Sequence, residues 1–167
     1  DFSNTILDGK TQKYKIFKKG NIKIGIFGLG INLDNLVGKK QYLETKYLNP
    51  IEIAQQYSKE LKVDKKCDLV ICLSHLGYDY KPEEKMISDK VIAKSTEHID
   101  LILGGHTHTF LPEPQKFTNK IGREILINQV GFAGLLLGRI DFYFDKNKNI
   151  QKISWNNQVI DDKILMS

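Results

Sequence analysis

In Leu101-Ile102-Leu103-Gly104-Gly105-His106-Thr107-His108-Thr109 an apolar run passes through two glycines into two histidines. The apolar run is typical of a buried strand. Glycine lets the backbone turn sharply and approach a ligand closely. Neutral imidazole is the commonest protein ligand for borderline transition metals. The segment therefore predicts a metal site at the end of a strand.

A second segment, Asp68-Leu69-Val70-Ile71-Cys72-Leu73-Ser74-His75-Leu76-Gly77, repeats this pattern. It too is an apolar run that ends in a histidine and a glycine. In a parallel α/β sheet, functional groups gather where strands end at their carboxyl edge. If the two strands are neighbours, we expect His75, His106 and His108 to meet at one edge of the sheet.

Other interpretations of these histidines stay open at this point. The segment after Leu103 can be a glycine-rich turn whose histidines cap a strand or form local hydrogen bonds. The fourth histidine, His98, precedes its strand and should lie at the opposite edge. We interpret His98 as a surface or structural histidine.

The two motifs resemble a known family. Ser74-His75-Leu76-Gly77 and Gly104-Gly105-His106-Thr107-His108 resemble the last metal-binding motifs of calcineurin-like metallophosphoesterases, most closely those of the 5'-nucleotidase branch. Asn128-Gln129-Val130-Gly131-Phe132-Ala133-Gly134 and Leu137-Gly138-Arg139-Ile140-Asp141 also resemble the segment that follows in that branch. The resemblance covers essentially the whole chain.

The resemblance implies an α/β fold, namely part of a metallophosphoesterase α/β/β/α sandwich with a mixed sheet, two crossover helices and antiparallel C-terminal strands. It also implies a pair of divalent metal ions, Mn, Zn, Co or Fe. It assigns His75 and His106 to one ion and His108 to the other. The other family ligands lie in Asp-x-His, Gly-Asp-x-x-Asp and Asn-His-Glu or Asn-His-Asp motifs, which this sequence lacks.

The catalytic histidine of the family lies in the last of these missing motifs, so no catalytic residue is assigned to this chain. Asp1-Phe2-Ser3-Asn4 resembles the family segment a short way beyond that motif. We therefore expect residues 1–167 to be the carboxyl-terminal portion of a metallophosphoesterase domain. Alone, such a chain should be inactive and bind at most one ion weakly.

For the parent protein the resemblance implies hydrolysis of a phosphomonoester, in particular of a nucleotide as in a 5'-nucleotidase. Two closely spaced cations would activate a hydroxide as the nucleophile. The resemblance places such a parent in the periplasm or at the cell surface. One alternative is a non-catalytic metal-binding or interaction module that needs another chain to complete a site. A third interpretation is an α/β domain of unrelated function with structural histidines.

Composition and charge bear on which classes of binding partner the chain favours. The chain has 167 residues, 41% of them hydrophobic and 27% charged, and a formal net charge of +5. Its basic residues are mostly scattered lysines, with Arg123 and Arg139 as the only arginines, which does not favour nucleic-acid binding. No apolar stretch approaches the ~20 residues needed to span a bilayer. The resemblance implies a nucleotide or other phosphomonoester as the substrate of the parent, and an incomplete domain could also associate with a second copy through its exposed core.

The amino-terminal half predicts a hairpin and two helices. Residues 14–17 and 22–27 should pair as strands around the turn Lys19-Gly20-Asn21. Asn49-Pro50-Ile51-Glu52 is a strong helix start, so we expect a helix from residue 50 to about 61. A second helix is expected near residues 81–94, with Pro82 in its first turn. Each helix would connect two parallel strands.

The remaining patterns concern glycines, cysteines and the carboxyl-terminal strands. Gly25, Gly28 and Gly30 do not follow the order of a nucleotide-binding loop, and we interpret them as sites of close strand packing.

Cys67 and Cys72 are interpreted as small buried apolar groups, too far apart along a strand for a disulfide. Residues 125–127, 135–144 and 150–160 predict an antiparallel region in which the second segment is central.

Overall fold

The computed structural model describes residues 1–34 and 36–161. The described strands form a six-stranded sheet, in the order β1-β2-β3-β4-β6-β5, and a separate two-stranded sheet. The strands are β1 (Tyr14–Lys19), β2 (Ile22–Leu29), β3 (Leu69–Ser74), β4 (Leu101–Leu103), β5 (Gln115–Thr118), β6 (Glu124–Asn128), β7 (Leu136–Phe144) and β8 (Ile150–Val159). The helices are α1 (Lys39–Tyr42), α2 (Pro50–Lys59) and α3 (Asp89–Ser95), with a π-helical turn at Glu60–Asp64 and a 3-10 turn at Pro82–Glu84.

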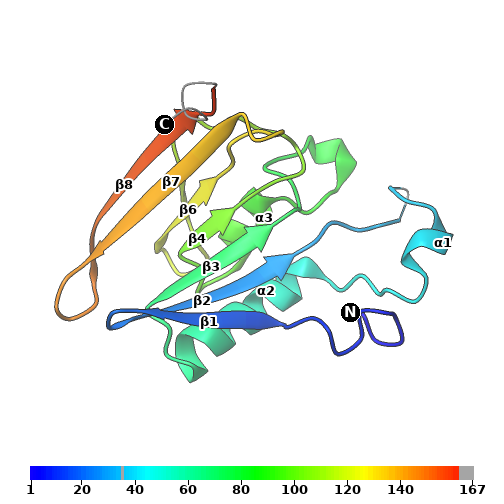
Figure 1. The fold of residues 1–167 in the computed structure, drawn as a ribbon, viewed down its shortest axis with the longest axis horizontal. Helices are drawn as coiled ribbons and strands as arrows, with labels where there is room; N and C mark the ends of the chain where they lie inside the picture. The colour runs from blue at the N-terminus through cyan, green and yellow to red at the C-terminus, as the bar shows by residue number, and fades with distance from the viewer. Residues whose placement is uncertain (35, 162–167) are drawn as a thin grey trace.

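The six-stranded sheet is mixed (Figure 1). Strands β2, β3, β4 and β6 run parallel to one another, whereas the edge strands β1 and β5 are antiparallel to β2 and β6. The predicted hairpin of β1 and β2 and the parallel pairing of the two histidine-bearing strands, β3 and β4, are confirmed. The mixed α/β fold expected from the sequence is therefore confirmed.

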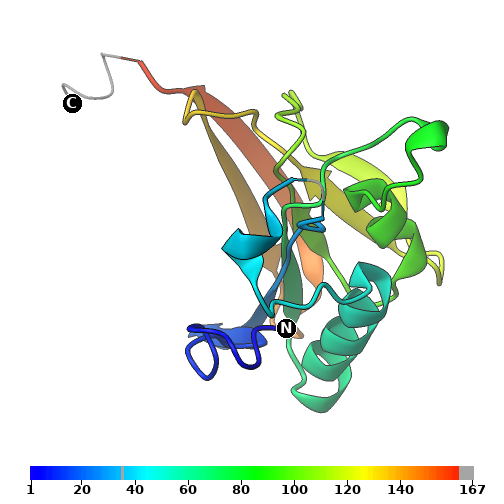
Figure 2. The ribbon, with the colours of Figure 1, turned by 90° about the vertical axis from the view of Figure 1, so that its right-hand side faces the viewer.

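Helices α2 and α3 lie on one side of this sheet and the β7–β8 hairpin lies on the other (Figure 2). The core fills the space between the sheet and the helices, where burying apolar side chains is the main stabilising term. Its buried members are Phe27, Leu29, Ala54, Leu61, Cys67, Val70, Cys72, Leu76, Ile92, Ala93, Ile99, Ile102, Ile125 and Ile127. Alternate residues of the central strands therefore face the helices.

Helix α2 begins as the sequence predicts. The Asn49 side chain accepts hydrogen bonds from the backbone N–H groups of Ile51 and Glu52, and Pro50 occupies the first helical position. The helix continues into the π-helical turn, where Leu61 is fully buried. A Cβ on Gly25 would lie 2.8 Å from Leu61 Cδ2, so this glycine allows close packing against the π-helical turn, whereas the sequence predicted close packing between strands. A Cβ on Gly30 would meet nothing within 4 Å, so there the expectation is wrong.

The second predicted helix begins later than expected. Pro82 starts only a short 3-10 turn, which ends at Lys85, a residue with a φ of 50°. This left-handed conformation cannot continue a helix. Helix α3 starts instead after Ser88, whose side chain accepts a hydrogen bond from the backbone N–H of Val91. A local cap thus determines the true start.

The predicted antiparallel carboxyl-terminal strands are confirmed for β7 and β8, which pair antiparallel, but two other features differ from the prediction. Strand β6 runs parallel to β4, and β5, which the sequence did not predict, completes that edge of the sheet. Strand β7 is not central, because among the described residues it pairs only with β8. Apolar composition alone overstated its burial, since Leu137 and Tyr143 are 58% and 48% exposed.

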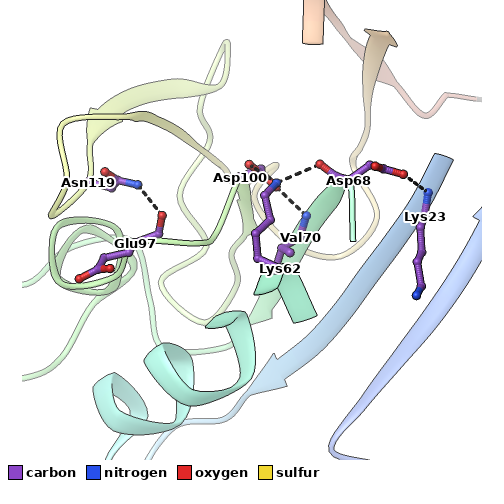
Figure 3. A network of polar contacts seen from close by, with 7 residues as sticks. All are labelled: Lys23, Lys62, Asp68, Val70, Glu97, Asp100 and Asn119. Atoms are coloured by element: carbon purple, nitrogen blue, oxygen red, sulfur yellow. Dashed lines mark hydrogen bonds and ion pairs between the residues drawn. The ribbon is translucent and has the colours of Figure 1, made fainter. Parts of the chain in front are cut away.

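A polar network fixes the strand ends opposite the histidine edge (Figure 3). Asp100 accepts a hydrogen bond from the backbone N–H of Val70 at 2.7 Å and forms an ion pair with Lys62 at 2.8 Å. Lys62 also donates to the backbone carbonyl of Asp68 at 2.9 Å, and the Asp68 side chain accepts from the backbone N–H of Lys23 at 2.8 Å. The network therefore connects the starts of β2, β3 and β4.

Within residues 1–34 and 36–161, the helices are too short or too polar for any of them to cross a lipid bilayer. Both cysteines are free and buried, as predicted for Cys67 and Cys72. Burial raises the pKa of the Cys72 thiol well above its usual value. The thiol is therefore an inert part of the core.

Candidate functional site

The candidate site lies where β3 and β4 end. Leu73 pairs with Leu103 in the parallel register of these strands, so the segments that follow leave the sheet at the same edge. His75 comes directly after β3, and its backbone N–H donates to the carbonyl of Leu29 at the end of β2 at 2.8 Å. His106 follows β4 after two glycines. The register of the sheet therefore places both histidines at one edge.

His75 and His106 lie close together. Their ring centroids are 5.3 Å apart, with an angle of 67° between the ring planes. A Cβ on Gly105 would lie 3.0 Å from His75 Nδ1, so glycine at this position leaves room for the His75 ring. Burial, and then the neighbouring imidazoles of His75 and His108, lower the pKa of His106. A lowered pKa favours the neutral imidazole, which is the form that binds metals.

The loop that carries His106 and His108 has an unusual backbone. These residues have φ angles of 73° and 54°, in the left-handed region that side chains other than glycine rarely adopt. Gln129 holds this loop by its side-chain amide. The amide nitrogen donates to the carbonyl of Gly105 at 2.7 Å, and the amide oxygen accepts from the Thr107 hydroxyl at 3.1 Å and from the backbone N–H of Thr109. The loop is therefore braced by one buried side chain.

The Thr107 side chain connects the loop to the segment after β3. Its hydroxyl oxygen accepts a hydrogen bond from the backbone N–H of Tyr78 at 3.0 Å. It also lies 3.0 Å from the hydroxyl of Thr109. The threonine between the two histidines therefore joins the segments that carry the imidazoles.

Aromatic rings support His108. The Phe132 ring is stacked on the His108 ring, with centroids 4.9 Å apart and planes at 23°. Phe110 meets Phe132 edge-on at 5.9 Å. A Cβ on Gly131 would overlap the Phe110 ring, so any larger residue there would force that ring to move. The loop after β6 thus fixes the plane of the His108 imidazole.

The fourth histidine lies elsewhere. His98 precedes β4 and is therefore at the other end of that strand from His106. Its side chain is 21% exposed, and its Nε2 lies 3.9 Å from a carboxylate oxygen of Glu97. This placement agrees with the predicted position at the opposite edge of the sheet, and the role of His98 as a surface or structural histidine stays a prediction.

The donor set present is incomplete for a metal centre. Among residues 1–34 and 36–161, no three His, Cys, Asp or Glu side chains are arranged to hold an ion. The structure brings His75 and His106 together as a pair, while His108 is near enough to lower the pKa of His106 but does not complete a cluster. Two imidazoles fit a metal ion chemically, but zinc takes three or four protein ligands. The assignment of the three histidines as metal ligands therefore stays a prediction.

Three residues that shape the site escaped the sequence reasoning. Gln129 and Phe132 lie in the segment that resembles the family, but nothing in that segment indicates which side chain supports the histidine loop. Asp89 is fully buried near the same edge, and its sequence neighbours give no sign of that burial. Each of these contacts depends on the tertiary structure and joins segments that are remote in sequence.

The fold is similar to that of solved structures of a 5'-nucleotidase and of a calcineurin-like phosphoesterase. In sequence the chain is similar to apyrases and 5'-nucleotidases. An apyrase of Tabanus yao is 29% identical over 157 residues, which cover 85% of this chain and 26% of the apyrase. The trifunctional nucleotide phosphoesterase protein YfkN of Bacillus subtilis is 28% identical over 83% of this chain and 9% of its own length. A 5'-nucleotidase of Vibrio cholerae is 28% identical over 87% of this chain and 29% of its own length.

Solved structures of 5'-nucleotidases and related phosphoesterases share the fold of this chain. The 5'-nucleotidase precursor of Thermus thermophilus superposes with a TM-score of 0.80 and 25% identity, over 96% of this chain and 32% of that chain. The calcineurin-like phosphoesterase YfkN of Bacillus subtilis gives a TM-score of 0.68 with 21% identity, which shows a shared fold. No family model matches the chain. The resemblance to the 5'-nucleotidase branch is confirmed by these relatives, and the chain spans about a quarter of the Tabanus apyrase.

Proposed function

We propose that this chain is the carboxyl-terminal portion of a metallophosphoesterase domain whose parent protein releases phosphate from nucleotides. The observation that carries the proposal is the His75–His106 pair at the carboxyl edge of two parallel strands. It supports the proposal because the relatives of the chain are apyrases and 5'-nucleotidases. The chain by itself is proposed to be inactive.

In this proposal His75 and His106 hold one divalent ion and His108 contributes to a second. A bound pair of ions would supply Lewis acidity and an activated hydroxide. The residues of this chain do the positioning: Gln129 fixes the histidine loop, and Phe132 fixes the plane of the His108 ring. The neutral imidazoles supply ligands without adding negative charge, which suits a site that receives an anionic phosphate ester.

The test uses the parent protein and this chain side by side. With Mn²⁺, Zn²⁺ or Co²⁺ present, the parent should release phosphate from AMP, ADP or ATP, and His75→Ala or His106→Ala should reduce the rate at least about a hundredfold, because each removes a metal ligand. His98→Ala is the matched control, since His98 precedes β4 and His106 follows it. A parent that hydrolyses no nucleotide or phosphate ester under these conditions would contradict the proposal.

A second candidate function is a non-catalytic metal-binding module completed by another chain. It is favoured by the donor set itself, because the described residues offer a pair of imidazoles and no larger cluster. In that case this chain should bind at most one Zn²⁺ weakly, and a partner should raise the affinity without producing hydrolysis. Calorimetry with Zn²⁺ and a phosphate-release assay on the same sample separate the two functions.

We also propose a cellular location for the parent protein and self-association of this chain. For the parent we propose a periplasmic or cell-surface location, as the resemblance to the 5'-nucleotidase branch implies. Self-association of this chain is supported by Leu73 and Leu103, paired neighbours on β3 and β4 that are 49% and 37% exposed. Exposed apolar patches of this kind favour protein contacts.

A further inference from the structure

Asp89 is a buried carboxyl group that the proposed function does not use. It is the first residue of α3, it is 0% exposed, and its backbone N–H donates to the carbonyl of Gly77 at 2.8 Å. Neither carboxylate oxygen has a well-aligned hydrogen-bond partner among the described residues. Because burying such a group is costly, its presence calls for a structural reason.

On one side Asp89 meets the glycine turn that leads to His106. A Cβ added to Gly104 would overlap Asp89 Oδ2 and would lie 3.1 Å from Gln129 Nε2. The carboxylate oxygen therefore occupies the space that a side chain at position 104 would fill. There it can accept a weak hydrogen bond from the Gly104 Cα–H. Asp89 and Gln129 together enclose the first glycine of the turn.

On the other side Asp89 meets the end of the strand that leads to His75. Burial raises the pKa of Asp89, and an interaction with the Ser74 side chain partly offsets this rise. The Ser74 hydroxyl also accepts a hydrogen bond from the backbone N–H of Leu76 at 3.2 Å. Ser74 directly precedes His75 in the sequence. One buried side chain thus contacts both strand ends that carry the paired imidazoles.

We propose that Asp89 is a positioning residue for the His75–His106 pair, because its side chain fills the space between Ser74 and Gly104 and so sets the separation of the two strand ends. The inference rests on the proposed function only in that the pair is taken to hold a metal ion. The contribution of Asp89 is its volume and shape, so an isosteric side chain should replace it.

The experiment measures Zn²⁺ affinity of the full chain by calorimetry. Asp89→Ala should weaken binding at least about tenfold, as is common when a group that orients a metal ligand is lost, whereas Asp89→Asn should stay within about threefold. Gly104→Ala should also weaken binding about tenfold, because its Cβ collides with the carboxylate. The double variant Asp89→Ala with Gly104→Ala should recover most of that loss, because the new methyl group fills the vacated space.

Asp79→Ala is the matched control, since Asp79 is another aspartate in the segment after β3 but its side chain is 49% exposed and paired with Lys90. It should leave Zn²⁺ affinity unchanged. Additive losses in the double variant, or an equal loss in Asp89→Asn, would overturn the positioning role.

A second readout separates this inference from the proposed function. If the unaltered chain binds no Zn²⁺, the metal assignment fails, and the ring resonances of His75 and His106 in nuclear magnetic resonance spectra then decide the positioning role. These resonances should shift in Asp89→Ala and in Gly104→Ala and return in the double variant. Unshifted resonances in both single variants would overturn the inference whatever happens to metal binding.

Discussion

At the scale of single residues, Asp89 makes the stability of the fold depend on pH. Burial raises its pKa from 3.8 to about 6. Between about pH 4 and pH 6, the Asp89 carboxyl therefore stays protonated in the folded state and is ionised in the unfolded state. The raised pKa adds roughly 3 kcal/mol to the free energy of unfolding, and this stabilisation is fully present below about pH 4 and is lost as the pH rises to about 6.

We predict that Asp89→Asn flattens this part of the pH profile, because an amide does not titrate. The measurement is the free energy of unfolding by urea from about pH 4 to pH 7, followed by circular dichroism. Asp79→Asn is the control with the opposite sign, since the Lys90 side chain lowers the pKa of Asp79 and its stabilisation is lost as the pH falls. An unchanged slope in Asp89→Asn would show that the carboxyl is not sequestered.

Substitutions of the glycines after β6 test how closely the Phe110 and Phe132 rings are packed beside His108. Gly131 and Gly134 have φ angles of 75° and 70°, but only at Gly131 would a Cβ meet other atoms, those of the Phe110 ring. We predict that Gly134→Ala costs about 1 kcal/mol from backbone strain and that Gly131→Ala costs about 2 to 4 kcal/mol, because overpacking is added. Thermal unfolding of the two variants gives the comparison. Equal losses would mean that the Phe110 ring moves aside freely.

At the scale of elements, the polar network at the opposite end of the sheet should contribute measurably. Asp100→Ala leaves the backbone N–H of Val70 without its acceptor and Lys62 without its ion pair. We predict a loss of about 2 kcal/mol in unfolding free energy, since a buried donor is left unsatisfied. Glu124→Ala, which breaks an exposed pair with Lys116 at 3.0 Å, should cost less than about 0.5 kcal/mol. Urea titrations of both variants check the ranking.

Elements with strong local signals could be predicted from the sequence. Helix α2 starts where Asn49 and Pro50 indicate, because capping and a fixed φ act within one turn of backbone. The start of α3 was misplaced because Pro82 is compatible with either an α-helix or a 3-10 turn, and the left-handed Lys85 that separates them leaves no sequence mark. Strand β5 escaped because Gln115–Thr118 is short and lies at an edge, where alternation is weak.

The candidate site was predictable in part for a similar reason. The edge shared by His75 and His106 follows from two strand-like runs and the rules of parallel sheets. The burial of Asp89 and the bracing by Gln129 could not be predicted, because each depends on contacts between segments remote in sequence. Strand β7 was misjudged because apolar composition does not reveal which neighbours a strand will find.

At the scale of the whole molecule, two exposed leucines of the six-stranded sheet should control association. We predict that the chain forms dimers or larger species as its concentration rises, and that Leu73→Gln with Leu103→Gln shifts it toward monomer. These residues are paired neighbours on β3 and β4, and both side chains are exposed. Sedimentation velocity over a range of concentrations is the measurement. Ile6→Gln is the control, since Ile6 is 83% exposed in the amino-terminal turns. A monomer at every concentration would contradict the prediction.

The left-handed backbone at His106 and His108 also bears on protein engineering. Residues held in such conformations revert to ordinary ones unless the surroundings enforce them, at about 1 to 3 kcal/mol each. A peptide with the sequence of the loop, or the same residues inserted into another protein, would adopt ordinary backbone angles and lose the arrangement of the two imidazoles. A transplant that keeps the geometry must carry the glutamine at position 129 along with the histidines.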